Sequence, residues 1–196
     1  MKKSSLMNSG GSHRHSNLPQ YERSEADLYV TPHEAVTRLY RARPHLKETW
    51  VWDSSAGLGH IVKAVHDAGG KAVGTELHDH PFPKQWPIHI GVDLLQQREP
   101  HAPVCVINPP YNQADKHIRH MLSLGCDVWA ILRFNFITAK SRAWMLGHLA
   151  EILMVGRTKM LPPGAIDRGM QPSIDYAWFL FTPEGNGGAG IRLERA

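Results

Sequence analysis

Asn108, Pro109, Pro110 and Tyr111 are the residues of this chain whose types best fit a chemical role. They follow the apolar run 104–107, whose lack of polar alternation predicts a strand buried on both faces. Proline cannot continue a hydrogen-bonded ladder, so we expect the strand to end at Asn108, on the ligand-binding edge of an α/β sheet. The two prolines restrict the backbone, so the Asn108 side-chain oxygen and the Pro109 carbonyl can converge on one point. Two such acceptors suit the two N–H groups of a planar amine.

Acceptors on both N–H groups also favour a lone pair localised on nitrogen, which an exocyclic amine needs before it attacks an electrophile. Tyr111 adds a ring on which a flat base can stack. The Asn-Pro-Pro-Tyr tetrapeptide resembles the catalytic motif of the amino-methyltransferases, chiefly those that methylate adenine N6. The alternative is a strand-ending turn with an incidental tyrosine, because short motifs also match by chance.

A second candidate site is the glycine-rich turn 53–59, which reads Asp-Ser-Ser-Ala-Gly-Leu-Gly and separates a predicted strand, 49–52, from a predicted helix. The next predicted strand, 71–75, ends on Glu76, close to the roughly 20-residue offset at which a carboxylate meets ribose hydroxyls. Val62 stands where a dinucleotide fingerprint needs its third glycine, and a carboxylate at Asp53 suits an ammonium group rather than a pyrophosphate.

The pattern D-x-x-A-G-x-G therefore resembles the cofactor loop of class I methyltransferases, which bind S-adenosyl-L-methionine. Ser54 and Ser55 depart from the Pro-Cys that often follows the aspartate in adenine-N6 enzymes. The resemblance implies these cofactor-binding residues: Tyr29, Thr31, Pro32, Asp53, Ser54, Ala56, Gly57, Gly59, Glu76, Asp93 and Asn108.

Two of these assignments have structural alternatives. Tyr-x-Thr-Pro at 29–32 resembles the segment that lines the methionine end of the cofactor, but Thr31 and Glu34 also predict a capping box for a helix starting at Pro32. Asp93 ends a predicted strand, 88–93, where the family's carboxylate accepts from the cofactor's adenine amine. An N-cap is an equally good interpretation of Asp93.

The stretch from Arg133 to Arg168 contains six cationic residues against only two carboxylates, Glu151 and Asp167. Basic residues interleaved with aromatic ones suit phosphate contacts and a stacked, extruded base. The alternative is an ordinary solvated surface with Phe134 and Phe136 in the core. The predicted substrate-binding residues are Tyr111, Arg133, Phe134, Phe136, Lys140, Arg142 and Arg168.

These elements predict an α/β, Rossmann-like class I methyltransferase fold: a mostly parallel seven-stranded sheet with an antiparallel last strand and helices on both faces. Further strands are expected at 128–132, 151–155 and 176–181, and further helices at 114–124 and 138–148. Residues 1–24 are expected to be a disordered leader, 25–183 the methyltransferase domain, and 184–196 a flexible tail.

The composition fits one globular domain: 196 residues, 42% hydrophobic and 20% charged, with a formal charge of +4 that permits a polyanionic partner. Two cysteines give neither a disulfide framework nor a zinc spacing, so no metal is predicted, and 78–80 (His-Asp-His) is interpreted as a solvated loop. Neither a membrane-spanning run nor a secretory leader is evident, which predicts a cytoplasmic protein without a membrane partner.

The sequence therefore predicts a methyltransferase acting on adenine N6, with nucleic acid as its partner, DNA rather than RNA. The alternatives are RNA adenine, protein glutamine N5, and a catalytically silent methyltransferase-fold binding subunit. Glutamine methyltransferases share Asn-Pro-Pro-Tyr, but they carry a helical substrate domain for which residues 1–28 are too few and too polar. Because the catalytic fold uses most of the chain, we expect target recognition from the loops 134–136 and 161–175, a homodimer or a partner subunit.

Overall fold

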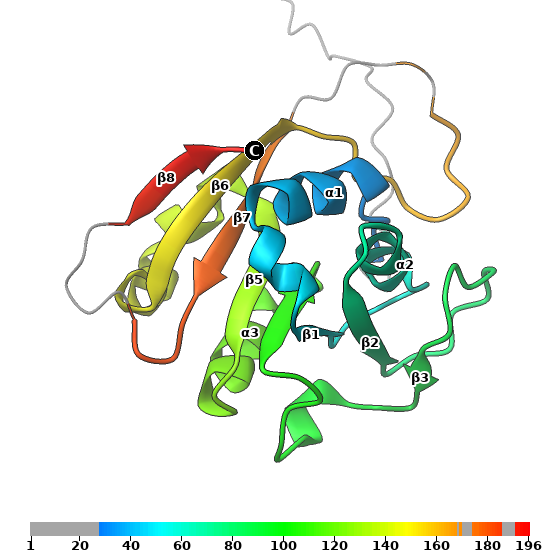
Figure 1. The fold of residues 1–196 in the computed structure, drawn as a ribbon, viewed down its shortest axis with the longest axis horizontal. Helices are drawn as coiled ribbons and strands as arrows, with labels where there is room; N and C mark the ends of the chain where they lie inside the picture. Colours follow the sequence, from blue (N-terminus) through cyan, green and yellow to red (C-terminus); the bar gives the residue numbers. More distant parts are fainter. Residues whose placement is uncertain (1–27, 168, 170–173, 186–190) are drawn as a thin grey trace, which may run out of the picture.

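The computed structural model describes residues 28–167, 169, 174–185 and 191–196 (Figure 1). The predicted leader, 1–24, and the predicted substrate-binding residue Arg168 lie outside these described residues.

The described strands form one eight-stranded sheet in the order β3-β2-β1-β4-β5-β7-β6-β8 (Figure 1). The strands are β1 (Trp50–Asp53), β2 (Lys71–Glu76), β3 (His89–Ile90), β4 (Val104–Ile107), β5 (Asp127–Arg133), β6 (Leu149–Arg157), β7 (Asp175–Phe181) and β8 (Arg192–Arg195). β7 runs antiparallel to both of its neighbours, β5 and β6, and all other neighbours are parallel. The predicted Rossmann-like sheet with an antiparallel late strand is confirmed.

The sheet has one more strand than predicted, because β8 pairs with the outer edge of β6. The expectation of a flexible tail is therefore wrong for residues 192–195. Ion pairs contribute to this edge: Arg43 bridges Glu151 of β6 and Glu194 of β8. All four β8 residues are exposed, so the strand has no apolar alternation that could identify it in the sequence.

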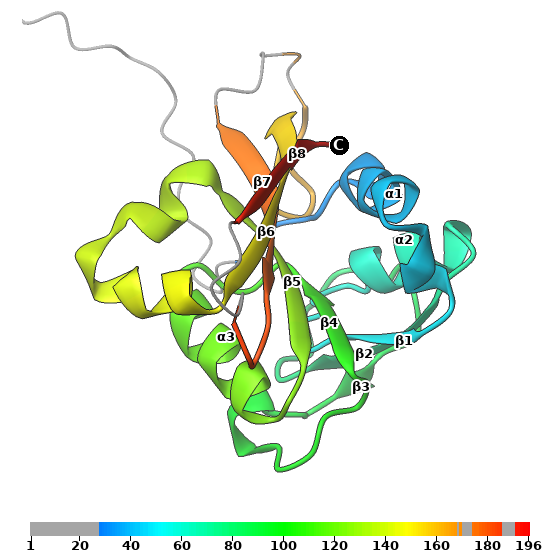
Figure 2. The same cartoon turned by 60° about the vertical axis from the view of Figure 1, so that its left-hand side comes forward.

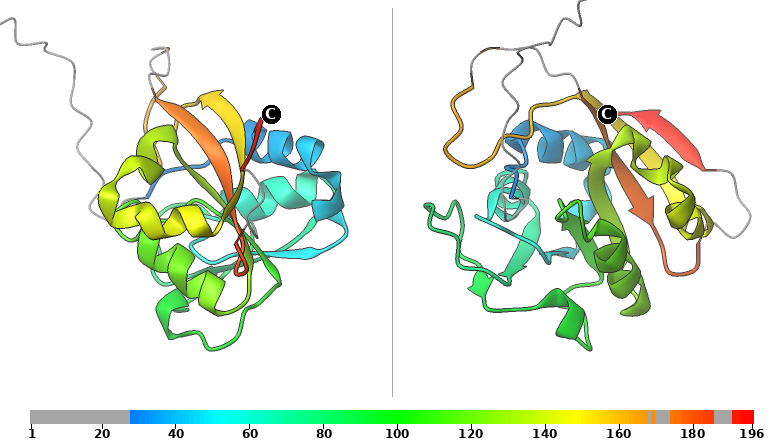
Figure 3. Two further views of the ribbon diagram at one scale, coloured as in Figure 1. Left: turned by 90° about the vertical axis from the view of Figure 1, so that its left-hand side faces the viewer. Right: turned by 180° about the vertical axis from the view of Figure 1, so that it is seen from behind.

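Helices cover both faces of the sheet (Figures 2 and 3). The α-helices are α1 (His33–Ala42), α2 (His60–Asp67) and α3 (Ala114–Ser123), and the 3₁₀-helices are η1 (Pro44–Lys47), η2 (Leu94–Gln96), η3 (Phe134–Thr138) and η4 (Lys140–Gly147). Within the described ranges, no helix is long and apolar enough to cross a membrane.

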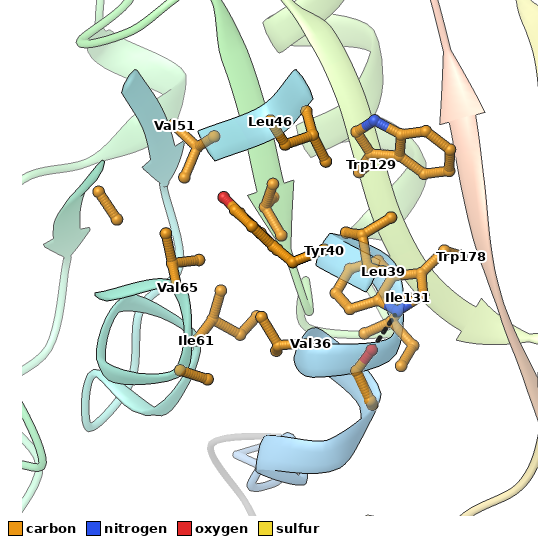
Figure 4. Packing of buried hydrophobic residues seen from close by; sticks show 14 of the residues in the cluster. Val36, Leu39, Tyr40, Leu46, Val51, Ile61, Val65, Trp129, Ile131 and Trp178 are labelled. Carbon is orange, nitrogen blue, oxygen red and sulfur yellow. Dashed lines mark hydrogen bonds between the residues drawn. The ribbon is translucent and has the colours of Figure 1, made fainter. Parts of the chain in front are cut away.

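The two faces have separate hydrophobic cores. α1 and α2 pack on one face, where Leu39 lies on the side of Trp178 and Ile131, and the Tyr40 ring points toward Val51 and Val65 (Figure 4). The Trp178 indole Nε1 donates to the Ala35 carbonyl at 2.9 Å, which ties α1 to β7. α3, η3 and η4 pack on the opposite face. The carboxyl ends of the central strands are therefore fixed from both sides.

Three local predictions were wrong in detail. The predicted helix 138–148 is 3₁₀-helical: only Met145 of η4 is buried, so η4 lacks the apolar stripe that holds an α-helix on a sheet. The predicted capping box is absent because Pro32 remains extended, at φ −62° and ψ 135°, and α1 begins at His33. The predicted strand 88–93 shrinks to the exposed β3, which leaves Asp93 beyond its end.

Candidate active site

A pocket of about 290 Å³ opens at the carboxyl ends of β1, β2 and β4. Its walls combine segments that are far apart in sequence, namely the stretch before α1, the glycine turn and the corner that follows β4. Nine of the predicted cofactor-binding residues line it: Tyr29, Thr31, Asp53, Ser54, Ala56, Gly57, Glu76, Asp93 and Asn108. Pro32 and Gly59 do not line the pocket.

The glycine turn needs its glycines for conformation and for space. Gly57 and Gly59 have positive φ angles of 55° and 82°, which side-chain-bearing residues rarely adopt. A Cβ at Gly57 would lie 2.7 Å from the Leu28 side chain, and one at Gly59 would lie 3.0 Å from the Trp86 carbonyl oxygen. The turn therefore has backbone without side chains at Gly57 and Gly59, immediately before the start of α2 and next to the pocket.

Glu76 fastens this turn to the end of β2. Its buried carboxylate accepts from the Gly57 N–H at 2.9 Å and, through the other oxygen, from the His78 N–H at 3.0 Å. The His80 ring lies 3.7 Å away. Each carboxylate oxygen can accept more than one hydrogen bond, so Glu76 can hold the loop and still accept from a hydroxyl in the pocket.

Asp53 is a buried acid with an unusual titration. Its side chain is 1% exposed, and burial raises its pKa to about 8; the nearby Glu76 charge acts in the same direction, against a hydrogen bond from the Ser55 N–H. In the described part of the chain, no cationic side chain lies within 4 Å of this carboxylate. A ligand ammonium group in the pocket would therefore supply the missing opposite charge.

Asn108 is held by two segments remote from it in the sequence. Its Nδ2 donates to the Tyr29 carbonyl at 3.1 Å and lies 3.8 Å from the Met160 sulfur. These two segments are themselves joined, because the Val30 N–H donates to the Leu161 carbonyl at 2.8 Å. With its N–H₂ directed at these partners, the Asn108 side chain retains its oxygen as the acceptor at the pocket wall.

The next residues of this proline corner have different surroundings. Pro109 is buried, and Pro110 lines the pocket. Tyr111 does not line it: the ring lies 5.9 Å from the Tyr29 ring, and its hydroxyl donates to the Tyr176 hydroxyl at 3.4 Å. The Arg133 guanidinium lies 5.3 Å above the Tyr111 ring, so a base stacking on that face must displace it.

The other predicted substrate residues divide into exposed and buried groups. Arg133, Phe134 and Lys140 are exposed. Phe136 is 7% exposed and belongs to the core, beneath an Arg142 guanidinium 3.7 Å from its ring. The core alternative is thus correct for Phe136, because η3 turns these two neighbouring phenylalanines to different sides.

Sequence reasoning missed His117, which lines the pocket from the first turns of α3. Its Nδ1 lies 3.1 Å from the Ser55 hydroxyl, and burial lowers its pKa. It lies in the predicted helix 114–124, where it borders the apolar stripe of Ala114, Ile118 and Met121. Its position beside that stripe was the available signal. The histidine thus connects the glycine turn to the helix that follows the proline corner.

Two further predicted residues also contact other parts of the fold. Asp93 is the N-cap of η2, accepting from the Leu95 N–H at 2.9 Å, and it also lines the pocket, so its two interpretations are compatible. The Ser54 hydroxyl lies 3.5 Å from the Met121 sulfur in the buried base of the turn. Among the described residues, no group of three or more histidine, cysteine or acidic side chains is arranged to hold a metal ion.

No protein-family model and no curated protein matches the chain. Solved structures do match. A candidate RNA methyltransferase, PH1948 from Pyrococcus horikoshii, superposes with a TM-score of 0.59 at 16% identity, over 80% of this chain and 87% of its own.

Two further matches have lower TM-scores. The M protein of the type I restriction enzyme EcoKI gives 0.50 at 16% identity, over 88% of this chain, which spans only half of the M protein. The magnesium protoporphyrin IX methyltransferase of Synechocystis PCC 6803, with bound S-adenosylmethionine, gives 0.51 at 14% identity, over 76% of this chain and 77% of its own. Together with the strand order, these likenesses give this chain the Rossmann-like fold of class I methyltransferases.

Proposed function

We propose that this chain transfers a methyl group from S-adenosylmethionine to an exocyclic amine, with adenine N6 in DNA as the first candidate target. The observation that carries the proposal is the setting of Asn108. Its amide donors are directed at the Tyr29 carbonyl and the Met160 sulfur, which leaves its oxygen to accept from an incoming amine beside the pocket. With the Pro109 carbonyl as a second acceptor, both N–H groups of the amine would be bound.

The pocket residues fit S-adenosylmethionine by charge and by size. Asp53 offers a buried carboxyl without a cationic partner within 4 Å in the described chain, which suits the ammonium group of the methionine end. Glu76 would accept from the ribose hydroxyls, and Asp93 from the adenine amine. A volume of about 290 Å³ is close to the lower end of ordinary cofactor pockets. The similar Synechocystis structure, which contains bound S-adenosylmethionine, also supports this cofactor.

The cofactor would supply a methyl group already activated on a sulfonium, so the protein needs neither a metal nor a strong base. What remains for the chain is to orient the amine and to stabilise the positive charge that develops on its nitrogen. Asn108 and Pro109 would do both with carbonyl oxygens, which is catalysis by positioning and electrostatics.

The test is methyl transfer from radiolabelled cofactor to a mixture of nucleic acids, followed by digestion to nucleosides and mass spectrometry. We expect N6-methyldeoxyadenosine. Calorimetry with S-adenosylmethionine is the companion measurement, because a silent scaffold has no reason to keep micromolar affinity. Tight cofactor binding without any methylated nucleoside would contradict the proposed target, and absence of cofactor binding would contradict the enzyme.

RNA adenine is the second candidate, since the neighbour PH1948 is described as a candidate RNA methyltransferase. Competition between matched DNA and RNA oligonucleotides for labelled methyl groups separates the two. Target recognition would come from the loops at the rim, a second copy of the chain or a partner subunit.

A further inference from the structure

Five cationic side chains lie on α3, on η4 and at the end of β5: Lys116, Arg119, Arg133, Lys140 and Arg142. We call this set the basic face. Within the described part of the chain, none of the five has a carboxylate within 4 Å. On α1 and α2, Arg38 pairs with Glu34, and Lys63 pairs with Asp67. The five cations of the basic face thus have no direct ion-pair partner among the described residues.

Aromatic rings hold the three guanidinium groups of this face in place. Arg119 of α3 lies 3.8 Å from the centre of the Trp144 ring of η4, which joins the two helices into one surface. Arg142 lies 3.7 Å from the Phe136 ring, and Arg133 lies 5.3 Å from the Tyr111 ring. Cation–π contacts orient a guanidinium while leaving its N–H groups able to bind an anion.

The basic face begins at the proline corner and extends away from it. Arg133 is the last residue of β5 and covers Tyr111, while Lys116 and Arg119 lie on α3, the helix that follows the corner in the chain. Phe134, 41% exposed, lies next to Arg133 as an aromatic surface open to solvent. An anion bound along this face would therefore lead directly to the candidate site.

We propose that the basic face binds the phosphate backbone of a nucleic-acid strand whose target base enters the pocket, an inference that rests on the proposed function. A polyanion matches a set of cations without direct ion-pair partners in the described chain, and Arg and Lys are the usual phosphate contacts. The exposed Phe134 ring would stack on a neighbouring base.

The experiment measures binding of short fluorescent single-stranded DNA and RNA oligonucleotides by anisotropy over a range of salt concentrations, without cofactor. The test variant is Lys116→Gln with Lys140→Gln, since both lysines are exposed and unpaired in the described chain. The matched control is Lys47→Gln with Lys71→Gln: these lysines are also exposed and unpaired there, but they lie on η1 and at the amino end of β2. Both variants change the net charge equally.

We expect the test variant to bind on the order of tenfold more weakly near 0.1 M salt, with a salt slope lower by about 1.4 for two lost single-strand phosphate contacts. The control should bind like the parent. Equal effects of the two variants, no binding by the parent at low salt, or equally tight binding of polyglutamate to the same face would overturn the inference. Binding that is tighter for either DNA or RNA supports the inference and shows which of the two nucleic acids the basic face prefers.

Methyl transfer, measured separately, distinguishes this inference from the proposed function. Oligonucleotide binding that depends on the two lysines, without methyl transfer, would support binding by the basic face and contradict the proposed activity. Methyl transfer with an unchanged oligonucleotide KM in the test variant would support the activity and contradict binding by the basic face. Calorimetry with S-adenosylmethionine should give the parent affinity for both variants.

Discussion

The glycine turn after β1 and the proline corner after β4 lie side by side on neighbouring parallel strands, yet they are built differently. In the glycine turn, Asp53 accepts from Ser55 two residues away, and Glu76 accepts from Gly57 within the same βαβ unit. In the proline corner, the Asn108 side chain donates to the Tyr29 carbonyl. Tyr29 precedes the βαβ unit in the chain, and Asn108 follows it. One site is assembled locally, and the other needs most of the fold.

This difference also separates the two roles. The local turn would determine how tightly the cofactor binds, and the corner would determine how fast the amine reacts. Mutations in the two regions should therefore change different constants, and the following predictions test that separation from the largest effect to the smallest.

Asn108→Ala should lower kcat by about 10²–10³, the usual loss for one aligned polar group in a transition state. Cofactor affinity should remain near the parent value, because the cofactor's charged groups are assigned to other residues. The kcat of Asn108→Asp should lie between those of the parent and of Asn108→Ala, because aspartate keeps an oxygen acceptor but loses the N–H₂ that donates to the Tyr29 carbonyl. Steady-state kinetics combined with calorimetry measures both constants. Parent-like turnover in both variants would exclude the proposed chemistry.

Glu76→Gln should weaken cofactor binding by about 10- to 100-fold, the equivalent of one hydrogen bond to a charged group. A glutamine side chain has only one oxygen, so it can accept from the N–H of either Gly57 or His78. Its N–H₂ group would then face the remaining backbone N–H, which is also a donor. Calorimetry gives the affinity, and kcat at saturating cofactor should change much less. Glu34→Gln is the control, because that exposed carboxylate pairs, among the described residues, with Arg38 on α1. A loss of kcat at unchanged affinity would mean that the two regions are not separable.

Cofactor affinity should rise as the pH approaches about 8, because burial raises the Asp53 pKa to about 8. Above that pH the affinity should fall again, because the ligand's α-amino group, with an ordinary pKa of about 8, loses its proton. Below that pH the ligand-free protein holds Asp53 protonated, and an ammonium group must displace the proton. The rise is at most about tenfold per pH unit, and calorimetry in buffers of different ionisation enthalpy should detect proton release. Asp53→Asn should abolish both signals. If proton release is equal in parent and variant, Asp53 does not receive the ammonium group.

The same shift affects stability in the free protein. The unfolded chain ionises Asp53 near its ordinary pKa, whereas the folded chain keeps the proton until about 8. The folded state therefore binds more protons between these values, and the free energy of unfolding should fall as the pH rises through that window.

Elements buried on the sheet were predictable from the sequence, and polar elements were not. The run 104–107 is β4 residue for residue, and the predicted helix 114–124 differs from α3 by one residue at its end. β8 was not predicted, and η4 was predicted as an ordinary helix, because neither element has an apolar pattern that matches its structure. The sequence also could not distinguish Phe136 from Phe134, because two phenylalanines on either side of one polar residue give no signal for which one enters the core.

The sequence by itself determined which residues meet at the sheet edge, because strand ends, glycine turns and prolines are local features of the chain. Tertiary structure alone decided how those residues are held: the Tyr29 carbonyl on Asn108, the contact of His117 with Ser55, and the guanidinium over Tyr111. These contacts join segments that are far apart in the chain and that meet in the packed arrangement of the sheet and its two helical layers. A hydrogen bond depends on distances below about 3.5 Å, and no sequence pattern specifies such distances between remote segments.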